Sequence, residues 1–419
     1  MTRYSTQHHP VIRSIAWEPE KPAEWLNDQI LMSRSTSNAY LIPGDEGDLV
    51  INTGTPYQGE RHRERFEQLL GRPLKVSKIL FTQSHPDHIG GWASFADPGV
   101  ETIVQREFPR ICQERKMMAR YFQPRGAKIL FTMMPRKEHS DAWHHGTRDP
   151  EGLTLFADSH AFLLGGRRVE ALSIPSGETL DSLAVWLPGE RTLFIGNWMG
   201  AIHGALPNFY TARGDRDRSV PGWLGEADML MSLRPTLLIT GHDDPVRGEA
   251  EVQAYLGKVR DAVRLIHDET VKGMNEHKDL WTLMGEIRLP AHLAPKPGRC
   301  PVSWVVRAVW EEYTGWFRAE STTELYPVPP ATIWPDLVRL SGGPDALVAA
   351  ARQRLEAGKP VEALHFVEIV LACEPTHRQG REAELAALEM LVEANGGLTF
   401  DELGWLETAI GQCRQVLGD

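Results

Sequence analysis

An apolar segment that runs directly into a histidine-rich loop is the feature that most restricts how this chain can fold. Residues 78–82, Lys-Ile-Leu-Phe-Thr, have the composition of a buried β-strand, and residues 83–91 follow as Gln-Ser-His-Pro-Asp-His-Ile-Gly-Gly. A loop at the end of a strand can hold polar side chains in a fixed place, because the sheet behind it is rigid. Two further apolar segments end in the same way, one before Glu178 and one before His242. We therefore expect three strand ends to meet at one site.

The segments around this loop predict a layered α/β fold that is followed by helices. Residues from about 29 to 54 have the pattern of three strands, and residues 57–70 have that of an amphipathic helix. This alternation is typical of layered α/β proteins. Residues 105–150 are polar and rich in Met and Arg, and we expect them to form a helix and an insertion that covers the site. From residue 249 onward helical spacing replaces the strand signals, and the last helices resemble a pair of tetratricopeptide hairpins.

Length and composition exclude several classes of protein. A chain of 419 residues is long enough for two or three domains, and we expect a boundary between residues 248 and 249. The net charge of −11 argues against binding to nucleic acid or to an anionic membrane. The four cysteines are scattered, which favours neither a thiolate zinc site nor a disulfide framework. Because we find neither a signal sequence nor an apolar run of membrane length, we expect a cytoplasmic protein.

The histidine-rich loop contains the donor atoms of a metal site. The nitrogens of His85 and His88 and the oxygens of Asp87 suit Zn, Fe or Mn. Asp87 and His88 are adjacent, so they can face one ion only if the loop bends, which Pro86 and the glycines after it permit. Taken alone, the two histidines could equally be surface residues. The two other strand ends favour the metal site.

The order and spacing of these segments resemble the metallo-β-lactamase superfamily, whose hallmark is His-x-His-x-Asp-His followed by later ligands. Residues 208–214, Asn-Phe-Tyr-Thr-Ala-Arg-Gly, resemble the anion-binding segment of the bacterial alkylsulfatase branch. Three helical segments resemble the dimerisation domain of that branch: residues 266–276, 302–317 and 340–375. The resemblance implies an α/β fold with an αββα metallo-β-lactamase sandwich, the catalytic domain, over residues 1–248. It also implies an all-α, tetratricopeptide-like dimerisation domain over residues 249–419, and hence a homodimer.

Carried over residue by residue, the resemblance implies two metal positions of unequal quality. The second position is matched without change by Asp87, His88 and His242. The first position would consist of the other matched residues: Gln83, His85 and Glu178. Gln83 stands where the family has a histidine, so this is a harder and weaker ligand set than three imidazoles.

Two asparagines weaken the expected centre further. Asn197 stands where relatives carry a carboxylate that bridges the two ions, and a neutral amide does not bridge two cations in that way. Asn52 stands where an aspartate usually supports the metal-bound histidines. We therefore expect one tightly bound divalent ion and a weak or empty first position. Zinc is the expected metal, with manganese and iron as alternatives, and a two-metal centre stays open because the amide oxygen of Gln83 can coordinate.

The same resemblance implies a metal-dependent hydrolase of an ester-like bond. An alkyl or aryl sulfate ester is the leading substrate, and metal-bound hydroxide is the expected attacking group. The planar guanidinium of Arg213 would hold the sulfate, because its geometry matches that of an oxyanion. Three polar residues of the same segment would assist it: Asn208, Tyr210 and Thr211. His203 is the candidate general acid, and Asp87 is counted with it among the catalytic residues.

Other interpretations of these residues stay open. The substrate is expected to be a small anionic ester with an apolar tail. Two tryptophans and four methionines could line a pocket for this tail, although core packing explains them equally well: Trp92, Trp198, Met117, Met118, Met133 and Met134. The site could instead hydrolyse a carboxylic ester, a lactone or a thioester. Two histidines and a carboxylate are also the ligands of mononuclear Fe(II) oxygenases. Gln83 and Asn197 could mark a non-catalytic relative that binds a metal or an anion, although the retained ligands of the second position argue against it.

Overall fold

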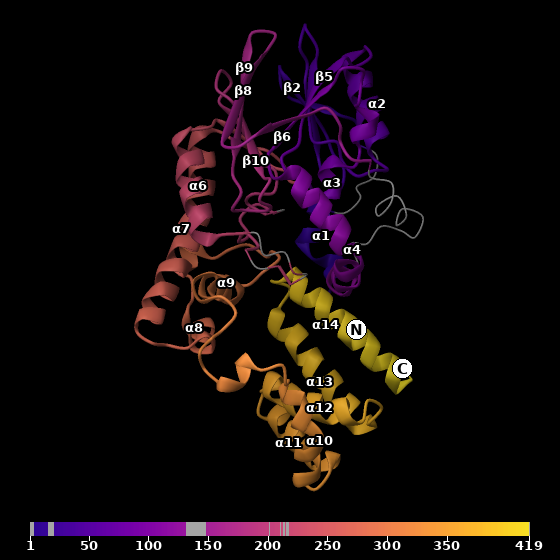
Figure 1. Ribbon diagram of the computed structural model, residues 1–419, viewed down its shortest axis with the longest axis vertical. Coiled ribbons are helices and arrows are strands. Elements are labelled where there is room, and N and C mark those ends of the chain that lie inside the picture. The colour runs from indigo at the N-terminus through magenta and orange to yellow at the C-terminus, as the bar shows by residue number, and fades with distance from the viewer. Residues whose placement is uncertain are drawn as a thin grey trace. The chain divides into compact units, whose positions relative to one another are not determined.

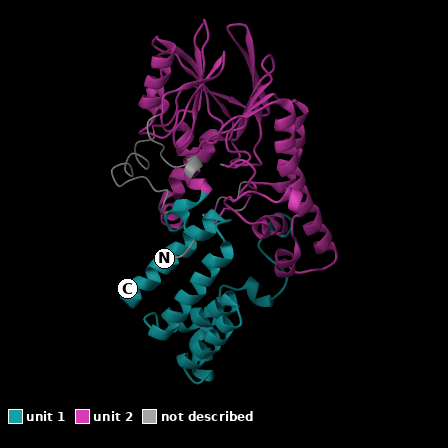
Figure 2. Ribbon diagram, turned by 180° about the vertical axis from the view of Figure 1, so that it is seen from behind, with its two compact units in different colours: residues 1–9, 127–132, 311–419 teal, residues 10–126, 133–310 magenta. Residues whose placement is uncertain are grey.

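The computed structural model of the chain describes residues 4–15, 21–130, 148–200, 202–209, 211–212, 214 and 218–418. Contacts between Cα atoms divide the chain into two compact units, which Figure 2 colours separately. Residues 10–126 and 133–310 form one of them, and residues 1–9, 127–132 and 311–419 form the other. We call them the sandwich unit and the helical unit.

The first sheet of the sandwich unit has seven strands in chain order. They are β1 (Glu24–Asn27), β2 (Ile30–Ser33), β3 (Ala39–Ile42), β4 (Asp48–Ile51), β5 (Val76–Leu80), β6 (Glu101–Gln105) and β7 (Leu153–Phe156). Neighbours from β1 to β4 are antiparallel, and neighbours from β4 to β7 are parallel. Since β4 and β5 run in the same direction, the loops that follow them leave the sheet at the same edge.

The second sheet has six strands in the order β13-β12-β11-β10-β9-β8. They are β8 (Ser159–Leu164), β9 (Arg167–Ser173), β10 (Leu183–Leu187), β11 (Thr192–Phe194), β12 (Leu237–Ile239) and β13 (Val246–Arg247). The pair β11 and β12 is parallel and the other pairs are antiparallel. As a result β9, β11 and β12 share one direction, and the loops after them emerge at one edge of this sheet.

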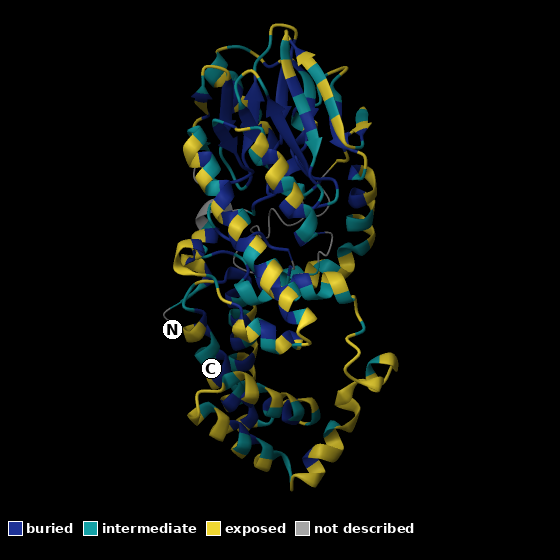
Figure 3. Cartoon of the chain, turned by 90° about the vertical axis from the view of Figure 1, so that its left-hand side faces the viewer, coloured by how far each residue is buried: buried dark blue, intermediate teal, exposed yellow. Residues whose placement is uncertain are grey.

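The two sheets pack face to face, and helices cover both outer faces. Apolar side chains of both sheets, from Leu26 to Ile239, form one buried cluster between them, and Figure 3 shows the strands mostly in the colour of buried residues. Phe66 of α2 packs on the outer face of the first sheet, and Trp223 of α6 packs on the outer face of the second (Figure 1). This arrangement confirms the predicted αββα sandwich.

The helices of the chain explain why its second half shows so few strand signals. They are α1 (Pro10–Ile15), α2 (Gly59–Leu70), α3 (Pro86–Ile89), α4 (Phe108–Leu130), α6 (Val220–Ser232), α7 (Glu249–Asn275), α8 (Leu280–Glu286), α9 (Val302–Thr314), α10 (Trp334–Leu340), α11 (Pro344–Glu356), α12 (Pro360–Cys373), α13 (Arg378–Asn395) and α14 (Phe400–Leu417). Short 3₁₀ turns are η1 (Thr6–His8), η2 (Trp92–Ser94), η4 (Ala291–Leu293), η5 (Thr322–Leu325) and η6 (Pro330–Ile333). Among the described helices, none combines the length and the apolar character that a bilayer span requires.

The helical unit is built from consecutive hairpins, as expected. Helices α11, α12 and α13 share a buried cluster that includes Val348, Val367 and Ala383. Helices α13 and α14 share a second one around Val392 and Leu406. At the other end of the chain, the backbone N–H of Thr6 donates to a carboxylate oxygen of Glu407 at 3.0 Å, which fastens η1 to α14.

Three local expectations concern the domain boundary, the apolar pocket and the insertion. Helices α7 to α9 share their core with the second sheet, so the division by contacts falls after Trp310 and later than the expected boundary after residue 248. The physical reason is that this sheet needs helices over its outer face. Trp92 and Trp198 are buried in the two outer cores, which agrees with core packing, and Met117 is exposed. The expected insertion falls largely on residues 131–147, which lie outside the described residues.

Candidate metal centre

The loop after β5 is fixed by an asparagine from the loop after β4. Asn52 has a left-handed backbone with a φ of 58°, a conformation that asparagine adopts more readily than most residues. Its side-chain oxygen accepts from the backbone N–H of Thr82 at 3.0 Å, and its side-chain nitrogen donates to the Thr82 hydroxyl at 3.0 Å. The asparagine therefore sets the direction in which the chain leaves β5. It supports the centre through the backbone and makes no described bond to its imidazoles.

Helix α3 turns the adjacent Asp87 and His88 toward one point. It is a single turn that begins at Pro86, and proline is favoured at the first position of a helix because its φ is already helical. His88 is fully buried, and Asp87 remains partly exposed. The bend that we expected between Asp87 and His88 is thus formed by a one-turn helix.

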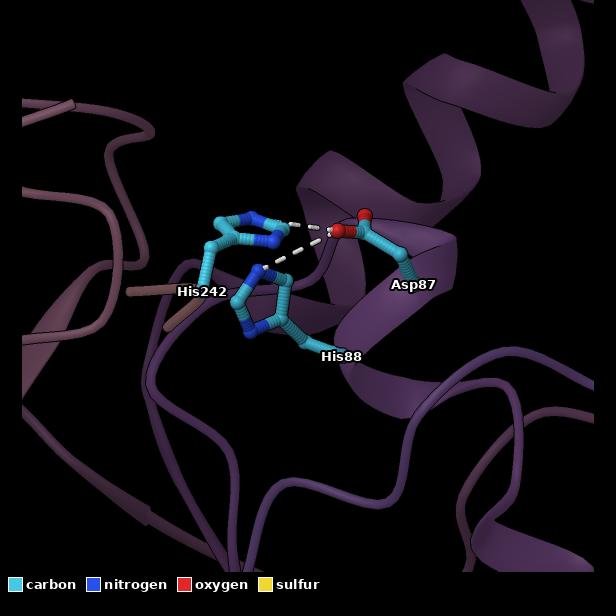
Figure 4. Close-up of side chains that lie close together, drawn as sticks. All are labelled: Asp87, His88 and His242. Carbon is cyan, nitrogen blue, oxygen red and sulfur yellow. Dashed lines mark ion pairs between the residues drawn. The ribbon is translucent and has the colours of Figure 1, made fainter. Parts of the chain in front are cut away.

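Asp87, His88 and His242 converge on a common point (Figure 4). The Oδ2 atom of Asp87 lies 3.4 Å from Nε2 of His88 and 3.5 Å from Nε2 of His242. The rings are nearly perpendicular, at 85°, with centroids 5.4 Å apart. His242 comes from the loop after β12, so the two sheets contribute to the group together.

The other nitrogen of each ring is held by the loop between β2 and β3. The Ser37 hydroxyl donates to the carbonyl oxygen of Gly241 at 3.3 Å, so it accepts from Nδ1 of His88 at 3.3 Å. Nδ1 of His242 donates to the carbonyl oxygen of Thr36 at 2.5 Å. These two oxygens favour the tautomer in which each ring carries its proton on Nδ1 and presents the lone pair of Nε2. Sequence analysis missed Thr36 and Ser37, although a run of hydroxyl residues at a strand end is a signal that could have found them.

The charge state of these groups suits a cation. Burial lowers the pKa of His88 to about 4, so its imidazole is neutral at neutral pH. Burial acts to raise the pKa of Asp87, but the three neighbouring imidazoles outweigh it and the pKa lies below its ordinary value. Within the described part of the chain, Nε2 of His88 has no hydrogen-bond partner. Two imidazoles and a carboxylate that converge on one point are donors suited to a divalent metal, so this position fits one.

The residues of the expected first metal position bond to one another. Nδ1 of His85 lies 3.0 Å from the side-chain nitrogen of Gln83 and 3.1 Å from a carboxylate oxygen of Glu178. The side-chain oxygen of Gln83 accepts from the backbone N–H of Asn197 at 3.2 Å. The structure therefore brings all three residues together, with Asn197 beside them.

A buried arginine, which sequence analysis missed, occupies the far side of this group. One terminal nitrogen of Arg218 lies 3.1 Å from the second carboxylate oxygen of Glu178, and its Nε donates to the Glu178 carbonyl at 2.8 Å. Its other terminal nitrogen donates to the carbonyl oxygen of Asn208. The only anionic side chain of the first position is thus already paired with a cation. In this state the first position does not fit a divalent metal.

Asn197 connects the two positions. Its backbone N–H bonds to Gln83, while its side-chain oxygen lies buried beside Gly241 with no hydrogen-bond partner among the described residues. A Cβ atom on Gly241 would meet that oxygen at 2.2 Å and Cε1 of His88 at 2.7 Å. The close approach of the two loops therefore requires glycine at this position.

The expected substrate-binding residues are only partly described. Tyr210 and Arg213 lie outside the described residues. Asn208 is buried, and its side-chain oxygen has no hydrogen-bond partner in the described part of the chain. The hydroxyl of Thr211 accepts from the backbone N–H of Gly214 at 3.1 Å, which shapes the turn at this segment.

His203 lies against the loop that carries His242. Its Nε2 contacts the carbonyl oxygen of Asp244, its backbone N–H donates to the Asp243 carboxylate at 3.1 Å, and its ring meets the edge of Tyr255. The ring would have to leave the Asp244 carbonyl before it could protonate a leaving group. Its expected role as a general acid stays a prediction.

Comparisons with known proteins follow the same division of the chain. Residues 33–242, half of the chain, match the metallo-beta-lactamase superfamily, and residues 283–402 match the alkyl sulfatase dimerisation family. A linear primary-alkylsulfatase of Pseudomonas sp. is 28% identical over 336 residues, which are 74% of this chain and 62% of that protein. An alkyl/aryl-sulfatase of Saccharomyces cerevisiae is 24% identical over 421 residues, which cover 89% and 64%.

A solved structure, that of the stereoselective inverting sec-alkylsulfatase Pisa1 from Pseudomonas sp., superimposes with a TM-score of 0.78. The superposition covers 95% of this chain and 66% of that one at 22% identity, and it supports the fold. The chain spans less than two thirds of the length of each of these three proteins.

Proposed function

The chain belongs to the metallo-β-lactamase superfamily and carries an alkylsulfatase dimerisation domain, and from this premise we propose that it hydrolyses alkyl or aryl sulfate esters at one divalent cation. The observation that carries the proposal is the convergence of donor atoms from Asp87, His88 and His242 on one point. The names of the similar proteins, two alkylsulfatases and an alkyl/aryl-sulfatase, support a sulfate ester as the substrate class.

Members of this superfamily generally bind divalent metals, and zinc is the ion that we propose for this chain. Two imidazoles and a carboxylate are suited to it. When bound, such an ion polarises an ester oxygen and lowers the pKa of the water that it binds. Asp87, His88 and His242 would hold the ion, while Ser37 and Thr36 would keep both rings in the tautomer that metal binding needs.

The sulfate would be held next to this position by the segment around residue 208. We assign the anion to Arg213, with Asn208, Tyr210 and Thr211 beside it, because a guanidinium pairs with two oxygens of an oxyanion at once. The buried side-chain oxygen of Asn208 has no hydrogen-bond partner among the described residues, which supports a polar partner there. The alkyl or aryl group of the ester would be the apolar tail of this small-molecule substrate.

The dimerisation domain supports a homodimer as the assembled form. The segment from Tyr313 to Leu340 exposes several large apolar side chains. Trp316 and Leu340 are each 72% exposed, and Tyr326 is 62% exposed. Apolar groups clustered in this way on a surface usually mark an interface, and a second copy of the chain is the partner that we propose.

Release of inorganic sulfate from a linear alkyl sulfate and from an aryl sulfate tests this function. We expect the zinc-reconstituted protein to release sulfate and His88→Ala or His242→Ala to fall to background. His365→Ala is the matched control, since that side chain is 74% exposed in the helical unit. A panel of carboxylic esters, lactones and thioesters is measured beside it. Turnover of those substrates alone, or turnover that needs oxygen and bound iron, would contradict the proposal.

A further inference from the structure

We propose that the guanidinium of Arg218 is the second cation of this centre and takes the role that a metal ion would have at the first position. The inference rests on the proposed function only in taking Asp87, His88 and His242 as the ligands of one ion. It concerns the neighbouring group of Gln83, His85 and Glu178. There the donor atoms are engaged by the protein itself.

The geometry of Arg218 is that of a built ion pair. Its side chain is only 1% exposed, and Glu178 is 10% exposed at the side chain. The guanidinium contacts both the carboxylate and the backbone carbonyl of Glu178, at 3.1 and 2.8 Å, so two points fix its orientation. A charge that is buried in this way is costly unless it is paired, and this contact pairs the two charges.

The charge balance of the first position leaves no demand for a further cation. Gln83 is neutral, and Glu178 is the only anionic side chain among the three expected ligands. Its charge is matched by Arg218. A divalent ion at this place would meet a carboxylate that is already neutralised and a guanidinium bound to that same carboxylate, so the ion would be repelled.

The contacts within the first position point the same way. His85 lies 3.0 Å from the side-chain nitrogen of Gln83 and forms an ion-pair contact of 3.1 Å with Glu178. Glu178 lies 3.1 Å from a terminal nitrogen of Arg218, and the backbone N–H of Asn197 donates to Gln83. At the second position, in contrast, the Nε2 atom of His88 has no hydrogen-bond partner among the described residues. The two neighbouring positions therefore have opposite needs, one for a cation from solution and one for none.

Arg218 also connects this pair to the segment that we assign to the sulfate. It donates to the backbone carbonyl of Asn208 while it holds Glu178. In this account Arg218 is a positioning residue, and its positive charge acts beside the substrate where a second ion would otherwise act. A metal titration of the protein should accordingly saturate at one equivalent.

Counting bound zinc by elemental analysis tests the assignment. The wild-type chain, the double variant Gln83→His/Asn197→Asp and the triple variant that adds Arg218→Gln are reconstituted with zinc and dialysed. We expect one ion per chain in the wild type and one in the double variant, because Arg218 still neutralises Glu178. We expect two ions in the triple variant, in which that carboxylate is released. Adding Arg218→Lys in place of Arg218→Gln keeps the charge and should keep the count at one.

A second measurement tests the inference if the triple variant does not fold. Glu178→Gln should leave the count at one and should lower the unfolding temperature of the metal-free protein, because it removes the buried ion pair with the guanidinium. The inference would be overturned by two ions in the wild type or in the double variant. It would also be overturned by a count that stays at one in a folded triple variant, or by a count that falls from two in the wild type to one in Glu178→Gln. A wild-type chain that binds no ion overturns the proposed function and the inference together, whereas two ions overturn the inference alone.

Discussion

At the scale of single residues, the centre depends on which nitrogen of each histidine carries its proton. The loop between β2 and β3 takes both Nδ1 protons, through Ser37 for His88 and through Thr36 for His242. Only then do the two Nε2 lone pairs face the carboxylate of Asp87. The tautomers are therefore set by partners that touch neither the ion nor the substrate.

Ser37→Ala should weaken zinc binding while leaving the fold intact. The hydroxyl is the acceptor that orients the His88 ring, and outer partners of metal-bound histidines contribute about 10- to 100-fold to affinity. Competition with a chromophoric chelator measures the dissociation constant. Ser232→Ala, at the exposed end of α6, is the matched control and should bind zinc like the wild type. An unchanged constant in Ser37→Ala would show that the ring needs no such partner.

His62 on α2 predicts a dependence of stability on pH. Burial lowers its pKa to about 3, with Arg65 and Arg61 acting in the same direction, and its Nδ1 lies 2.7 Å from the Ser33 hydroxyl. The unfolded chain takes up this proton below a pH of about 6.5, and the folded chain does so only near pH 3. The contribution to stability is therefore full above pH 6.5 and is lost as the pH falls toward 3. Between pH 7 and pH 4.5 the loss is about 2 to 3 kcal/mol.

Urea unfolding of the metal-free protein at both pH values measures this effect. His62→Gln should unfold more easily at pH 7, but the free energy of unfolding should decrease less between pH 7 and pH 4.5 than in the wild type. The comparison of the two chains isolates this residue from other groups that titrate in the same range. Equal decreases in both chains would contradict the assignment of the proton to His62.

At the scale of elements, the directions of the strands determine which loops meet at the site. The loops after β4 and β5 leave one edge of the first sheet, and those after β9, β11 and β12 leave one edge of the second. Five loops that are far apart in the sequence therefore meet in one place. Gly241 stands where two of them approach most closely.

Gly241→Ala should disturb the centre and lower stability together. The new methyl group would press on the side chain of Asn197 and on the His88 ring, and overpacking of this kind costs about 1 to 3 kcal/mol. Gly257→Ala on α7 is the control, because its Cβ would have an ordinary contact of 3.6 Å with Met231. Thermal unfolding and zinc affinity are the readouts. If Gly241→Ala matched the control in both, the close approach would not matter.

Strand ends and local chemistry made part of the site predictable. Asp87, His88 and His242 follow apolar segments, so the sequence pattern brings them together, and the α/β sandwich follows from the same pattern. The ion pair of Glu178 and Arg218 could not be predicted in this way, because it joins residues 40 positions apart and leaves no local signal. The run of hydroxyl residues that contains Thr36 and Ser37 marks this loop, but it does not show that the backbone carbonyl of Thr36 would be the group that contacts His242. The fold of the helices was predictable, but their assignment to a unit was not, since packing on a sheet depends on three-dimensional neighbours.

At the scale of the whole molecule, the proposed dimer predicts a change in mass on mutation. Trp316→Glu combined with Leu340→Glu places charges among the exposed apolar side chains of residues 313–340. Light scattering during gel filtration should give twice the chain mass for the wild type and the mass of one chain for this variant. Leu163→Glu is the control, because Leu163 is 65% exposed on β8, outside the dimerisation family match. A monomeric wild type would contradict the proposed dimer, and a variant that remains a dimer would place the interface elsewhere.

The central claim is that one cation lies among Asp87, His88 and His242. Anomalous diffraction from crystals grown with zinc tests it most directly. We predict a single strong peak per chain, about 2.0 to 2.2 Å from Oδ2 of Asp87 and from Nε2 of both histidines, with none beside Glu178. Density without a peak among these three atoms, or a peak of equal height at Glu178, would contradict the account.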